Sequence, residues 1–194
     1  FRPLKRYYGS RGLFIYREDY EPLLKNCHQL INQNDLILDI GANQGIYSLA
    51  FSKLTGPYGN VIAFEPFEKM TEYLKNNVEL NYLKNIKIYQ KVISDKVGYE
   101  ILDFGRGIVS ASIVRKFSSD KKIKIASTTI DQITKDYKKV NFIKMDIEGA
   151  ELKALIGAEM TLKKHKPILS LEVNRNSFFN IYNFLKPFGY KPYA

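Results

Sequence analysis

An acidic residue and two glycines lie close together near the start of the chain, in the segment Asp39-Ile40-Gly41-Ala42-Asn43-Gln44-Gly45. The segment follows an apolar run and precedes residues with helical spacing, which predicts a tight strand-to-helix turn. Glycine lets a ligand approach the backbone, and the amino end of a helix offers unpaired N–H groups. A second acid, Glu65, follows Gly45 by 20 residues at the predicted end of the next strand, where a carboxylate can bind both hydroxyls of a ribose. Together these features predict a nucleoside cofactor.

The glycine spacing separates two classes of nucleoside cofactor. Dinucleotide sites use the pattern G-x-G-x-x-G, but counting from Gly41 the second and third glycine positions hold Asn43 and Ile46. A carboxylate at Asp39 would repel a pyrophosphate, whereas it would attract the sulfonium or ammonium group of S-adenosylmethionine. The residues therefore favour S-adenosylmethionine over NAD, and a purely structural turn is the alternative.

Further acids stand at the predicted ends of later strands. Asp146 and Glu148 follow the apolar run 140–145, and Glu172 lies near the end of the run 168–173. Ligands of parallel α/β sheets bind at the carboxyl ends of the strands, so Asp146, Glu148 and Glu172 are candidates for proton transfer or acceptor binding. The alternative explanations are a favourable position for an acid in the first turn of a helix and a simple strand end.

Rare residues exclude several other kinds of site. Cys27 is the only cysteine, and His28 and His165 are the only histidines. One chain therefore cannot build a disulfide or a Cys/His metal cluster, and no metal site is predicted. Both histidines fall in segments with helical patterns, which argues against a histidine-based nucleophilic triad. Carboxylates are the expected proton-transfer groups.

The elements that must position these residues alternate between strand and helix. This order predicts an α/β protein with a doubly wound, mostly parallel sheet and helices on both faces. The predicted strands are 36–40, 61–65, 86–92, 140–145 and 168–173. The predicted helices cover 19–33 and the stripes Ile46–Leu54, Phe67–Val78 with Pro66 as first residue, Leu152–Met160 and Phe178–Leu185. Segments 99–104 and 122–128 are predicted to pair as a hairpin around the Gly/Ser-rich stretch 105–121, a candidate mobile flap.

Composition sets the broad class. With 194 residues, 45% hydrophobic and 26% charged, the chain is expected to be one soluble domain, 1–194, with a leading helical segment of about 1–35. No apolar stretch approaches the roughly 20 residues of a membrane span and no signal-peptide pattern is present, so a cytoplasmic location is expected. The net charge of +10 favours anionic substrates or nucleic acid, but most lysines are spread singly, as on a solvated surface.

Five sequence blocks resemble the FkbM-like S-adenosylmethionine-dependent methyltransferases. The block with D-x-E-G-A-E after an apolar strand is the most specific, and the resemblance covers about residues 36–173. The blocks are LILDIGANQGIYSLA (36–50), NVIAFEP (60–66), VISDKVG (92–98), TTID (128–131) and VNFIKMDIEGAELKALIGA (140–158).

The resemblance implies a class I methyltransferase fold and a role for each matching residue. It implies that the methionine part of the cofactor is surrounded by Asp39, Gly41, Ala42, Asn43 and Gly45. It also implies that Glu65 binds the ribose, that Pro66 belongs to the cofactor-binding set, that Ser94 and its neighbours lie near the adenine, and that Asp146 faces the methionine end and the acceptor. Residues 188–194 leave room for one terminal strand at most, so whether the usual C-terminal antiparallel hairpin is truncated stays open.

Three functions follow as hypotheses. The resemblance favours O-methylation of a hydroxyl on a sugar or small molecule. The positive charge favours an RNA methyltransferase as the alternative, although Asp146-Ile147-Glu148 stands where enzymes that methylate exocyclic amines carry Asn-Pro-Pro-aromatic. A cofactor-binding module without catalysis is the third. The sequence indicates neither the acceptor nor the oligomeric state.

Overall fold

A computed structural model describes residues 22–104, 111–112 and 122–193. The chain divides into two compact units, residues 1–90 and 91–194. The candidate flap at 105–121 lies outside the described residues except for Ala111–Ser112. The predicted α/β class with mostly parallel strand pairing is confirmed in the described chain.

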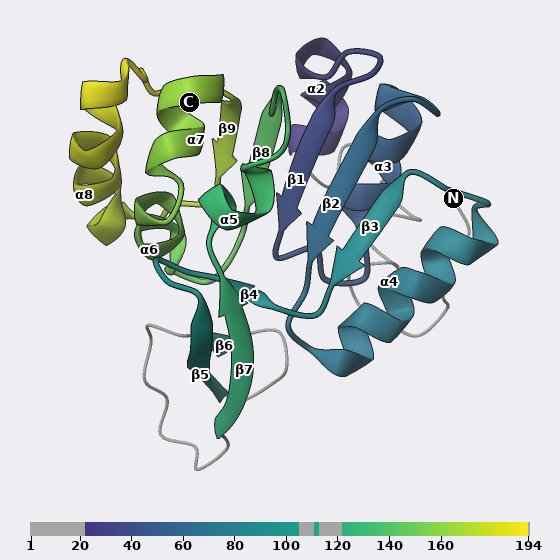
Figure 1. Ribbon diagram of the computed structural model, residues 1–194, viewed down its shortest axis with the longest axis horizontal. Coiled ribbons are helices and arrows are strands. Elements are labelled where there is room, and N and C mark those ends of the chain that lie inside the picture. Colours follow the sequence, from purple (N-terminus) through teal and green to yellow (C-terminus); the bar gives the residue numbers. More distant parts are fainter. Residues whose placement is uncertain (1–21, 105–110, 113–121, 194) are drawn as a thin grey trace. The chain divides into compact units, whose positions relative to one another are not determined.

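The first unit contains three parallel strands in the spatial order β3-β2-β1, which Figure 1 shows side by side and pointing the same way. β1 is buried along its whole length. α3 and α4 meet in one apolar cluster through Leu49 and Leu74, together with Ala63 of β2. The elements are α2 (Pro22–Leu30), β1 (Leu36–Ile40), α3 (Ile46–Thr55), β2 (Asn60–Phe64), α4 (Glu68–Leu80) and β3 (Ile86–Tyr89).

Strand register brings the first two predicted acids to one edge. Ile40, the last residue of β1, is level with Phe64, the last residue of β2. The turn that begins at Gly41 and the carboxylate of Glu65 therefore both follow strand ends at the same height, because adjacent parallel strands end at a common edge.

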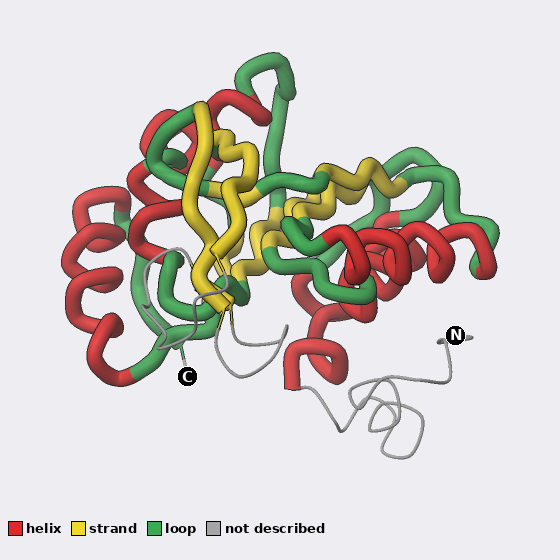
Figure 2. The backbone as a smooth tube through the Cα atoms, turned by 90° about the horizontal axis from the view of Figure 1, so that it is seen from below, coloured by secondary structure: helices red, strands yellow, loops and turns green. Residues whose placement is uncertain are grey.

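The second unit combines a parallel strand pair with a longer antiparallel ribbon. β8 and β9 are parallel, and β5 pairs antiparallel with β7. β4 lies parallel to β7, and β6 pairs with β5. The β5–β7 ribbon appears in Figure 2 as two long yellow segments side by side. The elements are β4 (Val92–Ile93), β5 (Gly98–Phe104), β6 (Ala111–Ser112), β7 (Lys122–Thr128), α5 (Ile130–Thr134), β8 (Phe142–Met145), α6 (Glu151–Ile156), α7 (Glu159–His165), β9 (Ile168–Leu171), α8 (Arg175–Leu185) and the 3-10 helix η3 (Lys186–Phe188).

Register also aligns the acids of this unit. Met145 at the end of β8 is level with Leu171 at the end of β9, and Glu172 N donates to Met145 O at 2.9 Å. Asp146 and Glu172 are therefore the first residues after two neighbouring parallel strands.

The predicted hairpin is confirmed, but several predicted boundaries are wrong. Pro66 is not the first helical residue, because Phe67 is the N-cap and α4 begins at Glu68. The predicted strand 86–92 is two strands, β3 and β4. Val92 and Ile93 pair with Ser127 and Thr128 of β7, whereas β3 pairs with β2.

The helix predicted over Leu152–Met160 is also two helices, α6 and α7. Gly157 caps the end of α6, and Ile156 and Met160 are exposed, so they do not continue a buried stripe. The leading helix is described from Pro22 and ends at Leu30.

After α8 and η3, no further strand forms between Gly189 and Tyr193 in the described chain. No helix among the described ranges combines the length and apolar character that crossing a bilayer would need.

Candidate functional site

The turn after β1 depends on three residues with left-handed backbone. Gly41, Asn43 and Gly45 have φ angles of 78°, 50° and 92°. Glycine adopts this region without penalty, and asparagine tolerates it better than most residues. A Cβ at Gly45 would also overlap the Leu74 side chain, so packing of α4 requires glycine there as well. The motif that predicted a tight strand-to-helix turn is confirmed as one.

Every backbone amide from Gly41 to Gly45 donates a hydrogen bond inside the first unit. The amides of Gly41 and Ala42 both donate to Phe64 O at 3.0 Å, and Gly45 N donates to Ala42 O at 2.8 Å. Asn43 N donates to Glu65 Oε2 at 2.8 Å, and Gln44 N donates to Asn43 Oδ1 at 2.8 Å. A pyrophosphate-binding loop needs amides that point at the ligand, so this turn is not arranged for one.

Glu65 ties the glycine turn to the start of α4. It is 4% exposed, its Oε2 accepts from Asn43 N, and its Oε1 accepts from Phe67 N at 2.9 Å. These two bonds fix the orientation of the Glu65 carboxylate. A carboxylate held in this way is a rigid acceptor, and its two oxygens can accept from two neighbouring hydroxyls.

The other predicted residues of this unit lie deeper. Asp39 is fully buried, and its Oδ2 accepts from Ser48 Oγ of α3 at 2.5 Å. The side chain of Ala42 packs in the apolar cluster, so only the backbone of this residue can contact a ligand. Pro66 is half-buried between Glu65 and the first residue of α4.

In the second unit, Asp146 and Glu172 form a carboxyl pair at the ends of β8 and β9. A side-chain hydrogen bond links them. That hydrogen bond and the charge of Asp146 are the largest causes that raise the pKa of Glu172 to about 7; burial and the charge of Glu148 also contribute, and Lys144 opposes them. The Glu172 carboxyl therefore exchanges its proton near neutral pH.

The loop between β8 and α6 holds the third predicted acid. Glu148 and Gly149 have left-handed φ angles of 55° and 94°. Glu151, 1% exposed, closes this loop because its Oε1 accepts from Ile147 N at 3.2 Å and Gly149 N at 3.1 Å. Asp146 and Glu148 therefore precede α6 and do not lie in its first turn, which removes the helix-dipole explanation for both.

One buried cation faces the carboxyl pair. Lys144, on β8, places its Nζ 3.7 Å from Asp146 Oδ2, and its side chain is 7% exposed. Lys144 therefore forms an ion pair with Asp146, which follows it by two residues in the chain.

The side chain of Ser94 bonds to acids other than this carboxyl pair. It is fully buried, and its Oγ donates toward Asp95 Oδ1 at 2.9 Å and Glu100 Oε1 at 2.7 Å. The exposed neighbour is Asp95, so any ligand contact by the Ser94 side chain would have to pass through this network.

Three residues that were not predicted from the sequence support those that were. Asn77, 4% exposed on α4, donates through Nδ2 to Gln44 O at 2.8 Å and so fixes the glycine turn. A polar residue within the stripe containing Leu74 and Val78 was the available signal. Glu100 and Lys153, which hold Ser94 and Asp95, carried no such signal because their contact joins residues 53 apart.

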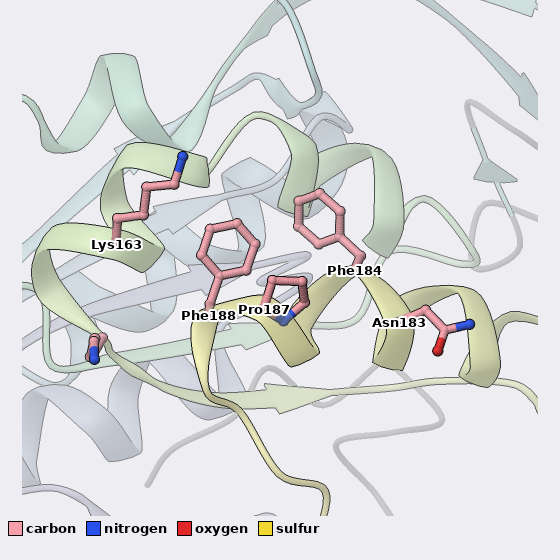
Figure 3. A pocket seen from close by; sticks show the side chains of 6 residues that line it. Lys163, Asn183, Phe184, Pro187 and Phe188 are labelled. Atoms are coloured by element: carbon pink, nitrogen blue, oxygen red, sulfur yellow. The ribbon is translucent and has the colours of Figure 1, made fainter.

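A hollow of about 570 Å³ lies elsewhere in the second unit (Figure 3). It contains none of the predicted site residues, and its Lys166 stands just before β9, whereas Glu172 follows that strand. The hollow is therefore at the opposite end of β9 from the carboxyl pair. Its lining residues are Lys163, Lys166, Asn183, Phe184, Pro187 and Phe188.

The two sets of residues suit different tasks. The first unit presents carboxylate acceptors beside amides that are already bonded, which fits a ligand rich in hydroxyl, amino or cationic groups. The second unit presents a carboxyl pair that shares a proton near neutral pH, which fits proton exchange with a hydroxyl.

Comparison with known proteins gives a consistent result. The family model for the Methyltransferase FkbM domain matches residues 39–192. "Methyltransferase sdnD" of Sordaria araneosa is 26% identical over 183 residues, covering 75% of this chain and 68% of that protein. The resemblance stated from the sequence blocks is thereby confirmed.

Solved structures agree on the fold. An rRNA methylase from Streptococcus thermophilus superposes with a TM-score of 0.54 at 9% identity, covering 86% of this chain and 76% of that one. A protein from Streptococcus mutans in complex with S-adenosylhomocysteine (SAH) gives a TM-score of 0.50 at 13% identity, covering 82% and 76%. The predicted class I methyltransferase fold is confirmed.

Proposed function

Because this chain belongs to the Methyltransferase FkbM domain family, we propose that it is an S-adenosylmethionine-dependent methyltransferase that methylates a hydroxyl of a sugar or small molecule. The observation that carries the choice of a hydroxyl acceptor is the carboxyl pair of Asp146 and Glu172, with the pKa of Glu172 raised to about 7. A group that titrates near the working pH is suited to proton transfer.

The donor set of the first unit supports the cofactor. When bound, S-adenosylmethionine supplies a methyl group on a positively charged sulfur. In the proposal, Glu65 accepts from the ribose hydroxyls, and its bonds from Asn43 N and Phe67 N hold the carboxylate in position for them. Asp39 contributes negative charge toward the cationic methionine end, and Gly41, Ala42, Asn43 and Gly45 supply the backbone surface beside it. Pro66 limits the ribose side.

In the second unit, the proposal assigns the acceptor to the acids after β8 and β9. The acceptor hydroxyl donates its hydrogen bond to Asp146 or Glu172, and its proton passes to whichever carboxylate is ionised as the oxygen becomes nucleophilic. Lys144 forms an ion pair with Asp146, and Glu148 borders the acceptor. Ser94 and its neighbours take the adenine.

The test separates cofactor binding from methyl transfer. Asp146→Ala is expected to abolish transfer of labelled methyl from S-adenosylmethionine to glycan and metabolite fractions while SAH still binds in isothermal titration. Asp136→Ala, at an exposed acid after α5, is the matched control and should retain activity. Full activity in Asp146→Ala would overturn the assignment of the acceptor acids. Cofactor binding without transfer to any fraction would instead favour a module that binds without catalysis.

RNA is the second candidate acceptor, and the net charge of +10 favours it. The similarity in fold to an rRNA methylase is compatible with this choice. RNA retained on a filter at low salt and released as salt rises would support it, because phosphate contacts release counterions. No retention at low salt would eliminate it.

A further inference from the structure

The loop Ser94–Asp95 is fixed by side chains from two other elements of the second unit. Lys153, on α6, places its Nζ 2.6 Å from Glu100 Oε1 on β5 and 3.7 Å from Asp95 Oδ1. The Ser94 hydroxyl is shared between the same two carboxylates. One lysine therefore contacts both acids that hold the Ser94 side chain (Figure 1 gives the positions of β4, β5 and α6).

The Lys153–Glu100 contact is strong and partly shielded from water. The Glu100 side chain is 10% exposed and that of Lys153 is 27% exposed. Burial raises the pKa of Glu100, but hydrogen bonds from Lys153 and Ser94, with the charges of Lys153 and Lys96, outweigh it and leave the pKa below its usual value. Glu100 is therefore ionised at neutral pH, and its charge is matched mainly by Lys153.

This balance leaves Asp95 as the exposed acceptor of the loop. Its side chain is 36% exposed and stands farther from Lys153 than Glu100 does. Of the two acids that Lys153 contacts, Asp95 is therefore the one with the more exposed carboxylate. Lys153 thus contacts both the shielded acid and the exposed acid to which the Ser94 hydroxyl donates.

The backbone at the end of α6 packs closely against the same loop. A Cβ at Gly157 would overlap Ser94 O and lie 3.2 Å from Asp95 Cα. α6 therefore meets the Ser94–Asp95 loop twice, through the Lys153 ammonium and through a glycine backbone that admits no side chain. Two independent contacts from one helix indicate that this loop is held in a set position.

We propose that Lys153, through its ion pair with Glu100, is a positioning residue that sets the Ser94–Asp95 loop to recognise the exocyclic amino group of the adenine. The inference rests on the proposed function, because it presumes that this loop meets the cofactor's base. Lys153 acts through Glu100, Ser94 and Asp95 and needs no contact of its own with the cofactor.

The test uses two ligands that differ at one group. SAH carries the adenine amine, and S-inosylhomocysteine carries a carbonyl in its place. The wild-type chain is expected to bind SAH more tightly. Lys153→Met keeps most of the apolar stem and removes the ammonium. It is expected to weaken SAH about tenfold, the size of one charge-assisted hydrogen bond, and to leave S-inosylhomocysteine nearly unchanged in isothermal titration.

Controls separate this role from a general loss of structure. Lys163→Met removes the lysine of an exposed ion pair with Glu159 on the neighbouring helix α7 and should change neither affinity. Lys153→Arg keeps the cation and should retain most of the discrimination. In a cycle with Glu100→Gln, the double variant should be no worse than either single one.

The outcomes distinguish failure of the proposed function from failure of the positioning role of Lys153. If the wild-type chain binds neither ligand, the proposed function fails. If it binds SAH and Lys153→Met weakens both ligands equally, or weakens neither, the positioning role is overturned while the proposed function stands.

Discussion

The acids that follow β1 and β2 and the acids that follow β8 and β9 are held in place by different partners. In the first unit, Glu65 is buried and both its oxygens accept from backbone amides. In the second, Glu172 is exposed, and its main partner is another carboxyl group, that of Asp146.

These different partners determine which carboxyl group can change its protonation state. Backbone amides donate at any pH, so they keep a carboxylate such as Glu65 fixed in geometry and suited to binding. A second carboxyl group instead competes for the same proton, which gives Glu172 a pKa of about 7. The fixed acceptor in the first unit thus suits the binding proposed for it, and the titrating pair in the second unit suits the proposed proton transfer.

A substitution at Gly45, in the first unit, is predicted to change the free energy of unfolding most. Gly45→Ala combines a left-handed φ of 92° with an overlap on Leu74, so the free energy of unfolding should fall by about 2–4 kcal/mol. Gly189→Ala is the matched control, because its φ is 86° but no atom lies within 4 Å of the added Cβ. Urea unfolding measures both, and equal losses would show that packing against α4 contributes nothing.

A smaller effect is expected from weakening the fixed acceptor itself. Glu65→Gln places an amide NH2 against one of the two backbone donors, so the unfolding free energy should fall by about 1–3 kcal/mol even without a ligand. Glu68→Gln, at the exposed first residue of α4, should cost a few tenths of a kcal/mol, roughly the worth of a helix-dipole contact. Thermal and urea unfolding check both, and a Glu65→Gln loss no larger than the control would contradict the role of Glu65 as a link.

The smallest effect concerns the titrating pair. The folded-state pKa of Glu172, about 7, lies above its ordinary 4.5, so the folded chain binds more protons between these values and loses stability as pH rises through them. Glu172→Gln stays neutral and avoids that loss. Its thermal midpoint should match the wild type at about pH 4 and exceed it at about pH 8.

The matched control is Glu72→Gln, at an exposed residue of α4, which should show the same difference from the wild type at both pH values. A Glu172→Gln variant that is equally displaced at both pH values would contradict a shared proton.

The elements that the sequence predicted well are those with strong local signals. β1 was predicted residue for residue over 36–40, because a fully buried parallel strand is a nearly continuous apolar run, here interrupted by Asp39 and followed by glycine. The glycine turn and the acids after the strands followed from the same local pattern. Their burial did not, because Asp39 is enclosed by partners such as Ser48 that a pattern does not reveal.

The missed features depend on contacts between distant segments. Val92 does not belong with the rest of the predicted strand 86–92, because Val92 and Ile93 pair with β7, more than 30 residues later. The predicted helix over Leu152–Met160 is broken at Gly157, where the backbone must approach Ser94. Local apolar spacing contains neither fact, since both arise only once the chain has folded.

The saturated amides of the turn from Gly41 to Gly45 have an energetic consequence for any ligand that docks there. Folding has already removed the conformational entropy of this backbone, so binding need not order the turn again. Affinity at this edge of the first unit is then limited by desolvation and by the ligand's own freedom. A preorganised turn of this kind should show slow amide hydrogen exchange in the free protein, as slow as in the strands beside it.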